Sequence, residues 1–199
     1  MRGASITASA AAALGGVRQD GFRYANIAQG QRGVSRDPEM MFTTVLGSCV
    51  AACLFDPEAR IGGMNHFLLA EPDEDQYVDA VAAQRYGVHA MELLINEMLQ
   101  AGADRRRLRG HLYGGANLHA GMRAIGTSNA EFAIRFLRDE GIPLMARNLG
   151  GTSARRVDFQ PAHGRARCRI VQDSVADELP RRLSSARFPA VSSGDLELF

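Results

Sequence analysis

The segment from Val50 to Leu69 reads VAACLFDPEARIGGMNHFLL and consists of two apolar runs with a polar stretch between them. The polar stretch, Asp56 to Arg60, contains an Asp-Pro pair, which is typical of a tight turn. Short apolar runs bounded by turn residues indicate buried strands. We therefore predict a β-hairpin from the runs 50–55 and 61–69, with a short helix beginning at Ser48 as the alternative.

The register of this hairpin decides whether a thiol and an imidazole lie close together. If Asp56 lies opposite Ile61, then Ala51 lies opposite His66, and Cys49 becomes the diagonal neighbour of His66 on the same face. Diagonal cross-strand positions are roughly 7–8 Å apart, a gap that an imidazole can span. A shift by one residue would place the two side chains on opposite faces, so the predicted pair depends on the register.

The sequence before the hairpin predicts two further strands. Residues 40–46 are apolar and β-branched, as in a buried strand, and are followed by Gly47 and Ser48. Residues 22–28 alternate like a strand, and the stretch 29–39 between the two is expected to be a loop.

The sequence after the hairpin predicts two helices and more strands. A helix over about 80–100 carries an apolar stripe at helical spacing, formed by Val88, Met91, Leu94, Ile95, Met98 and Leu99. A strand is expected to end near Tyr113. A second helix is expected to open with the capping box Ser128-Asn129-Ala130-Glu131 and to stop at Gly141. Its inner stripe contains Phe132, Phe136 and Leu137.

The C-terminal part of the predicted domain contains strands only. A strand is expected over 142–146, and a hairpin over 155–159 and 165–171. In the last strand, Ala166, Cys168 and Ile170 are expected to face inward and the arginines between them outward. Strands outnumber helices and the helices lie between groups of strands, so we predict an α/β fold, a layered sandwich of β-sheet with helices packed outside.

The length of 199 residues predicts one domain, over residues 22–171. Residues 1–21 are rich in small residues and are expected to form a disordered N-terminal extension. A signal peptide is the alternative, but the Ala-, Ser- and Thr-rich middle of this segment is less apolar than a secretory signal. Residues 172–199 are expected to be a loosely attached tail.

The composition excludes several reaction classes, because all 23 basic residues are arginine. Without lysine there is no Schiff-base chemistry, no Walker A phosphate loop and no kinase motif. A net charge of +1 predicts no strong attraction to nucleic acid or membranes, and no apolar run is long enough to insert into a bilayer. Three cysteines argue against a disulfide framework, so we expect a reducing, cytoplasmic location.

Cys49 and His66 are the residues most suited to chemistry. A neighbouring imidazolium lowers a thiol pKa from its usual value of about 8.5, and the thiolate attacks acyl carbons. Gly47 allows a sharp turn that can direct a backbone N–H at an oxyanion. A hydroxyl suffices to orient the histidine, and Thr43 and Thr44 are both candidates.

Simpler interpretations stand beside this one. A cysteine inside an apolar run is usually a packing residue, which suits Cys53 and Cys168. The spacing Cys49-x3-Cys53 is compatible with zinc, but no compact second pair of ligands follows, so we expect no metal.

Several sequence blocks resemble the CheD family of chemoreceptor glutamine deamidases. The most specific are Leu46-Gly47-Ser48-Cys49 and Gly63-Met64-Asn65-His66, and the resemblance spans residues 22–171. Further blocks are Tyr113-Gly114-Gly115-Ala116-Asn117, Ile125-Gly126 with Asn129, and Leu149-Gly150-Gly151 with Arg155. One departure is Asn148, where we expect an acidic residue.

The resemblance implies a fold related to bacterial deamidating toxins and assigns three catalytic residues. Cys49 is the implied nucleophile, His66 the general base and acid, and Thr43 the third residue. The implied reaction converts glutamines in the cytoplasmic helical region of methyl-accepting chemotaxis receptors to glutamate, without a cofactor. A CheC-type phosphatase is a second implied partner. The alternatives are a non-catalytic regulator that binds receptors or such a phosphatase, and a receptor glutamyl methylesterase.

Overall fold

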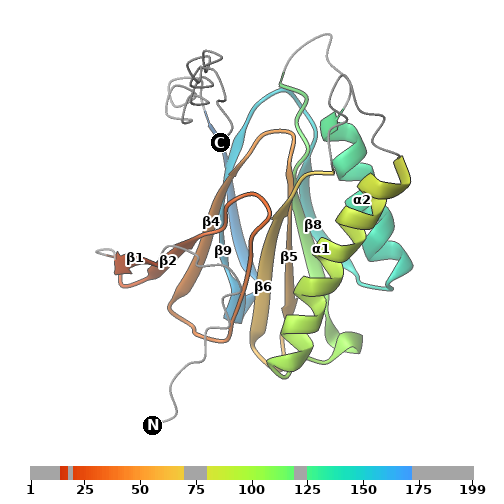
Figure 1. The fold of residues 1–199 in the computed structure, drawn as a ribbon. Helices are drawn as coiled ribbons and strands as arrows, with labels where there is room; N and C mark the ends of the chain where they lie inside the picture. The colour runs from red at the N-terminus through yellow and green to blue at the C-terminus, as the bar shows by residue number, and fades with distance from the viewer. Residues whose placement is uncertain (1–13, 18–19, 70–79, 119–124, 172–199) are drawn as a thin grey trace, which may run out of the picture.

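The computed structural model describes residues 14–17, 20–69, 80–118 and 125–171, which form two five-stranded sheets and two α-helices (Figure 1). The first sheet contains, in spatial order, β1 (Leu14–Val17), β2 (Arg23–Asn26), β4 (Met40–Leu46), β9 (Arg155–Gln160) and β10 (Arg165–Ile170). The second sheet contains β3 (Arg32–Ser35), β6 (Ile61–Phe67), β5 (Val50–Asp56), β7 (Arg109–Gly114) and β8 (Leu144–Leu149). The helices are α1 (Ala80–Gln100) and α2 (Ile125–Asp139), and two short 3-10 helices are η1 (Arg105–Arg107) and η2 (Pro161–His163).

The second sheet is the middle layer of the molecule. Both helices lie on its outer face, and the first sheet faces its other side (Figure 1). The alternation of strand side chains therefore directs one half of β5 toward the helices and the other half toward the first sheet. Val50, Ala52 and Leu54 pack with the helices, whereas Ala51 and Cys53 pack between the sheets.

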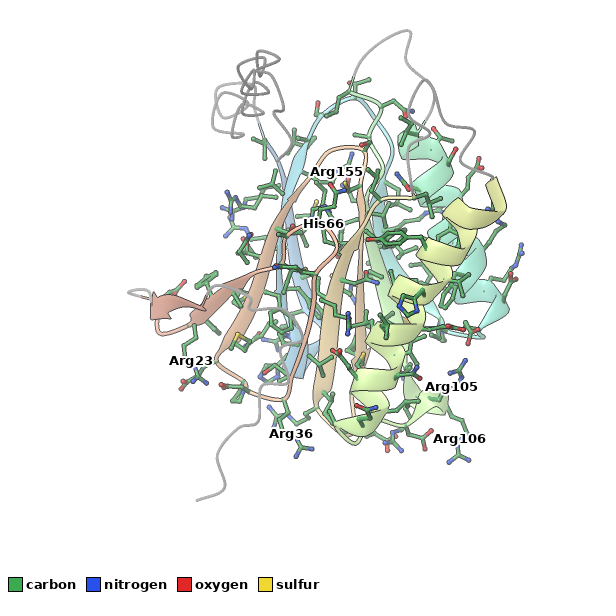
Figure 2. The ribbon with its side chains drawn as sticks, viewed as in Figure 1. Arg23, Arg36, His66, Arg105, Arg106 and Arg155 are labelled. Atoms are coloured by element: carbon green, nitrogen blue, oxygen red, sulfur yellow. The ribbon has the colours of Figure 1, made fainter. Side chains whose placement is uncertain are left out.

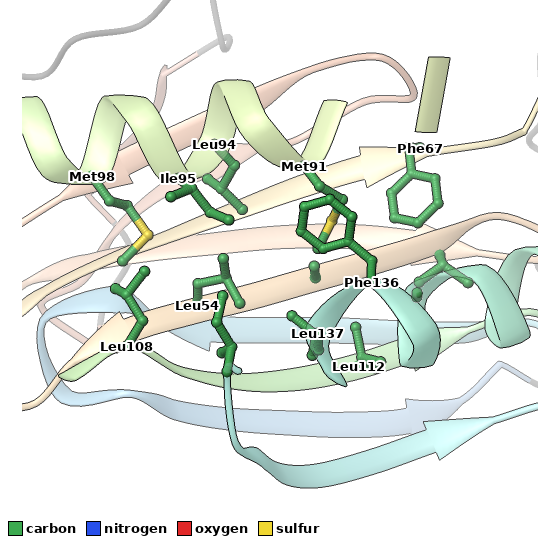
Figure 3. Close-up of a cluster of buried hydrophobic side chains, with 14 of the residues drawn as sticks. Leu54, Phe67, Met91, Leu94, Ile95, Met98, Leu108, Leu112, Phe136 and Leu137 are labelled. Carbon is green, nitrogen blue, oxygen red and sulfur yellow. The ribbon is translucent and has the colours of Figure 1, made fainter. Parts of the chain in front are cut away.

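Each interface buries an apolar core. Figure 3 shows the core between the helices and the second sheet, where Met91, Leu94 and Ile95 of α1 belong to the same buried cluster as Leu54 of β5. The core between the sheets contains Phe42 and Phe159 of the first sheet and Met64 of the second. These two cores hold the helices on one side of the middle layer and the first sheet on the other, which supports the layered α/β sandwich predicted from the sequence.

The central hairpin has the predicted structure and register. β5 and β6 pair antiparallel with Asp56 opposite Ile61 and Ala51 opposite His66. The alternative helix at Ser48 is absent, because β5 begins at Val50. The helix predicted over 80–100 is α1, and the C-terminal hairpin is formed by β9 and β10.

Three local predictions are wrong. The expected loop 29–39 contains β3, which forms because β6 supplies its hydrogen-bonding partners. The second helix begins at Ile125 instead of at a Ser128 cap, because the Asn117 side chain accepts a hydrogen bond from Gly126 N. Ile170 is 65% exposed and does not face the core, since it ends the edge strand β10.

The predicted terminal segments fall mostly outside the described residues. Within the expected N-terminal extension, Leu14–Val17 form β1, which pairs antiparallel with β2. The rest of that extension, 1–13 and 18–19, and the tail 172–199 lie outside the described part of the chain. Neither described helix combines the length and the hydropathy needed to cross a bilayer.

Candidate functional site

Cys49 lies where the chain passes from one sheet to the other, between β4 and β5. Two backbone bonds hold this crossover: Gly115 N donates to Cys49 O at 2.7 Å, and Ala116 N donates to Gly47 O at 2.9 Å. Gly114 has φ +112°, and a β-carbon there would overlap the Cys49 carbonyl oxygen. Glycine is therefore required for β7 to approach the cysteine backbone this closely.

Asn129 of α2 connects the same crossover to the segment just after β6. Its side chain is fully buried, its Nδ2 donates to Ser48 O at 2.9 Å, and its Oδ1 accepts from Leu69 N at 2.8 Å. One amide thus connects the residue before Cys49 to the segment that directly follows the strand carrying His66. The sequence placed Asn129 in a capping box and in a block that resembles the family, but it did not reveal this role, because the two partners are distant in the chain.

His66 faces the first sheet from β6, and its ring is held there by two oxygen atoms. Nδ1 lies 2.9 Å from Thr44 Oγ1 and 3.2 Å from Ile27 O, and Thr44 Oγ1 donates its own proton to Ile27 O at 2.7 Å. Both atoms can therefore only accept from the ring, so Nδ1 carries the proton and Nε2 has the free lone pair. This is the tautomer that a general base requires.

The environment of His66 keeps the ring neutral. Burial lowers its pKa below the ordinary 6.5, and the hydrogen bond to Ile27 O offsets this only in part. Nε2 is buried and has no hydrogen-bond partner within the described residues. A buried nitrogen with an unused lone pair is costly to keep in a fold, and such atoms often mark functional sites.

Thr43, the third residue implied by the resemblance, does not contact His66. Strand alternation in β4 directs Thr43 to the outer face of the first sheet, where its hydroxyl donates to Asp158 Oδ1 at 2.8 Å. Its neighbour Thr44 faces inward and contacts the ring. Of the two threonines that the sequence left open, the structure places Thr44 beside the histidine.

The thiol of Cys49 is half-buried and has a side-chain amide beside it. Its Sγ donates to Gln29 Oε1 at 3.6 Å. Gln29 belongs to the segment 28–31, which is joined to the His66 backbone by Gly30 N donating to His66 O at 2.7 Å. Gln29 was not among the residues selected from the sequence, since it lies in the stretch that was expected to be a loop.

A second loop beside the crossover is held by Arg155, which lies toward the same end of the sandwich as His66 (Figure 2). Its Nη1 donates to Asn148 O at 2.6 Å and to Asn148 Oδ1 at 2.5 Å, and its Nη2 donates to Gly150 O. The amide of Asn148 thus serves as the acceptor where a carboxylate was expected. Gly150 N in turn donates to Gly114 O at 3.0 Å, which links this loop to the glycine beside Cys49.

The other two cysteines have a different environment. Cys53 is fully buried, and burial followed by the proximity of Cys168 raises its thiol pKa well above the ordinary value. Burial also raises the pKa of the Cys168 thiol, although the charge of Arg155 opposes the shift. Both thiols therefore stay protonated and weakly nucleophilic at neutral pH. In the described ranges, no three His, Cys, Asp or Glu side chains are grouped so as to hold a metal ion.

Comparison with known proteins identifies close relatives of this chain. The family model described as CheD chemotactic sensory transduction matches residues 68–170. A relative from Caulobacter sp. (strain K31) is 54% identical over 174 residues, which are 87% of this chain and 92% of the relative. One from Zymomonas mobilis is 58% identical over 152 residues, 76% of this chain and 82% of the relative. Each is named "Probable chemoreceptor glutamine deamidase CheD".

Two solved structures show weaker similarity. A Neisseria meningitidis protein, NMB0706, aligns with a TM-score of 0.39 at 13% identity and covers 68% of this chain and 65% of its own. The Bacillus licheniformis protein YfiH aligns with a TM-score of 0.40 at 13% identity and covers 60% of this chain and 50% of its own. The assignment rests on the family model and on the relatives, which match most of this chain at more than half identity: the chain belongs to the CheD family.

Proposed function

We propose that this protein is a hydrolase that converts side-chain amides of glutamines in chemoreceptors to carboxylates. The observation that carries the proposal is the set of contacts of His66: Nδ1 lies beside Thr44 Oγ1 and Ile27 O, and Nε2 has no partner among the described residues. The names of the relatives supply the substrate class. The proposed catalytic domain is 22–171, with 1–21 and 172–199 as an extension and a tail.

In the proposed reaction, His66 Nε2 takes the proton of the Cys49 thiol, and Sγ attacks the amide carbon. The C=O electron pair moves to oxygen, and we propose that backbone N–H groups of the Ser48–Cys49 crossover stabilise the charge there. Collapse breaks the C–N bond, and the imidazolium protonates the departing ammonia. Water, deprotonated by Nε2, then hydrolyses the thioester, which releases glutamate and restores the thiol. None of these steps needs a metal or organic cofactor.

Thr44 has a positioning role in this proposal. It accepts from Nδ1–H and stabilises the imidazolium that forms in both halves of the reaction. The resemblance assigns this role to Thr43, and the contact at 2.9 Å supports Thr44 in its place.

The proposed substrate region is the cytoplasmic helical part of methyl-accepting chemotaxis receptors, which requires a cytoplasmic enzyme. A CheC-type phosphatase is a proposed second partner that would bind the same face as the substrate. We propose no nucleic acid as a partner and no direct insertion into the membrane.

The decisive experiment incubates a receptor cytoplasmic fragment with the wild-type protein and with Cys49→Ser, and maps amide-to-acid conversion by peptide mass spectrometry. We expect conversion to fall by at least about 10³-fold in Cys49→Ser, because nucleophile and base act as a unit. Cys168→Ser is the matched control and should convert the receptor normally. Conversion that persists in Cys49→Ser would exclude this nucleophile.

Two additional readouts separate the alternative functions. Ammonia release without methanol release supports deamidation, whereas methanol release from methylated receptor would indicate a methylesterase. A Cys49→Ala protein that still binds receptor and restores chemotaxis would favour the non-catalytic regulator.

A further inference from the structure

A glutamine of the chain itself already lies at the candidate nucleophile. Gln29 Oε1 accepts the hydrogen bond from Cys49 Sγ at 3.6 Å. Its carboxamide is the same functional group as the proposed substrate, so the free protein presents an amide to its own thiol. This inference rests on the proposed function of Cys49 and His66.

The backbone that carries Gln29 is anchored to the catalytic strand. Gln31 N donates to Ala28 O at 2.9 Å, and Gly30 has φ +80°, so residues 28–31 form a type II turn with Gln29 at its second position. Gly30 N donates to His66 O at 2.7 Å, and His66 N donates to Gln31 O at 3.0 Å. The turn that presents Gln29 is therefore hydrogen-bonded to the residue that is the proposed base.

The side chain of Gln29 has the freedom that attack requires. The residue is exposed, and its amide carbon lies only about 1.2 Å from the oxygen that the thiol contacts. Rotation about its side-chain bonds can bring this carbon to Sγ without moving the turn. Because the amide is tethered, no bimolecular encounter is needed, an advantage equivalent to about 10⁵ M or more in well-oriented cases.

We propose that Gln29 is a self-modification site that Cys49 deamidates to glutamate. His66 Nε2 accepts the thiol proton, the Sγ–Cδ bond forms, and the Cδ–Nε2 bond of Gln29 breaks as the imidazolium protonates the leaving nitrogen. The products of this first half are ammonia and an internal thioester between Cys49 and residue 29. One water molecule, deprotonated by His66, breaks the Cδ–Sγ bond and leaves a carboxylic acid at position 29. The sum is one amide plus one water giving one acid plus one ammonia.

A neighbouring glutamine provides an internal control. Gln31 lies in the same turn, but its Oε1 accepts from Ala28 N at 3.0 Å and so stays with the backbone of the turn. Trypsin cleaves after Arg23 and Arg32 and releases residues 24–32 as one peptide that contains both glutamines and Asn26. Fragment spectra of this peptide locate a new acid at 26, 29 or 31.

The test follows this peptide in freshly purified wild-type protein and in Cys49→Ala, over time at neutral pH. We expect an acid at position 29 in the wild type, on isolation or during incubation, at a fraction at least about 10-fold above that in Cys49→Ala. Gln31 and Asn26 should stay unconverted in both proteins. Cys168→Ala should behave as the wild type, and circular dichroism should show that both variants are folded.

The outcomes separate this inference from the proposed function. Equal conversion of position 29 in the wild type and Cys49→Ala, with normal conversion of a receptor fragment, overturns self-modification and leaves the receptor activity intact. Conversion of Gln31 to the same extent as Gln29 also overturns it, because it shows spontaneous chemistry. Failure on both the receptor and Gln29 overturns the proposed function as well. Blocking Cys49 of the wild type with iodoacetamide should stop conversion without any substitution.

Discussion

The two ends of the β5–β6 hairpin differ in how their buried polar groups are paired. At the turn, the Asp56 carboxylate accepts several hydrogen bonds, whereas at the open end one ring nitrogen of His66 has no hydrogen-bond partner among the described residues. Asp56 is 1% exposed and accepts from Arg107 Nη2 at 2.8 Å and from Asp104 N at 2.9 Å. The N–H groups of Glu58 and Ala59 add two more bonds at 3.0 Å. One hairpin thus has an end suited to stability and an end suited to reaction.

The pKa values of the two groups express the same difference. Burial alone would raise the pKa of Asp56, but the bonds from Arg107 and the backbone outweigh it and hold the pKa well below the usual range. At His66 burial prevails over the bond to Ile27 O and lowers the pKa. A charge that is fully paired stabilises the turn, while a neutral base with a free lone pair remains available for a proton. Figure 2 shows Arg105 and Arg106 of η1, which adjoins the Asp56 turn, at the opposite end of the sandwich from Arg155.

The largest expected effect is a loss of stability at the closed end. Asp56→Ala removes the buried carboxylate that Arg107 contacts at 2.8 Å and should lower the free energy of unfolding by about 3 kcal/mol. This is the low end for a broken buried ion pair, because Arg107 is one-third exposed and keeps Asp104 at 3.3 Å. Urea denaturation measures the loss. Deamidation per folded molecule should be unchanged at low temperature, and a specific loss of activity would contradict the division between the two ends.

The second prediction compares two buried asparagines that each hold two elements together. Asn129→Ala and Asn65→Ala each remove buried hydrogen bonds and should cost about 1–3 kcal/mol of stability. Asn65 joins Ala52 N to Ala90 O on the helix side, whereas Asn129 holds Ser48 O at the crossover. When both variants are assayed well below their melting temperatures, only Asn129→Ala should lower kcat. Equal kinetic losses in the two variants would indicate a general loss of packing.

A smaller effect should separate the two threonines. Thr44→Val keeps the side-chain shape but removes one acceptor for Nδ1–H of His66. Because Ile27 O remains as an acceptor, kcat should fall by about 10-fold. This is far less than the roughly 10⁴-fold fall in kcat when the carboxylate of a catalytic triad is replaced. Thr43→Val should leave kcat unchanged, since its hydroxyl bonds to Asp158 on the outer face. The reverse order would favour the assignment implied by the family resemblance.

The smallest effect is on pH dependence. His66 has a lowered pKa in the folded protein, so its stabilising effect is complete above pH 6.5 and is lost as the pH falls through the lowered value. Asp56 behaves in the same direction at lower pH, below its ordinary 3.8. As the pH is lowered, the urea concentration at the unfolding midpoint should therefore fall in two steps. His66→Gln should remove only the step at the higher pH. The acid limb of kcat/KM should have its midpoint below pH 6.5.

Much of the fold and part of the site could be predicted from the sequence. The hairpin over 50–69 and its register, with Ala51 opposite His66, were predictable because two apolar runs flank one strong turn. β3 was missed because its pairing partner, β6, lies far along the chain. The start of α2 was missed because its cap is a side chain from another loop, Asn117, and a local pattern at Ser128 suggested a different start.

The sequence by itself determined which residues could react: a cysteine after a glycine-serine pair, a histidine in the facing strand, and no lysine to support other chemistries. Only the tertiary structure decided how they are arranged. Thr44 instead of Thr43 reaches His66 because β4 presents alternate residues to the other sheet, and Gln29 reaches Cys49 because its turn is bonded to β6. Local patterns fix periodicity within one strand, but the choice between faces and partners depends on contacts between segments distant in the chain.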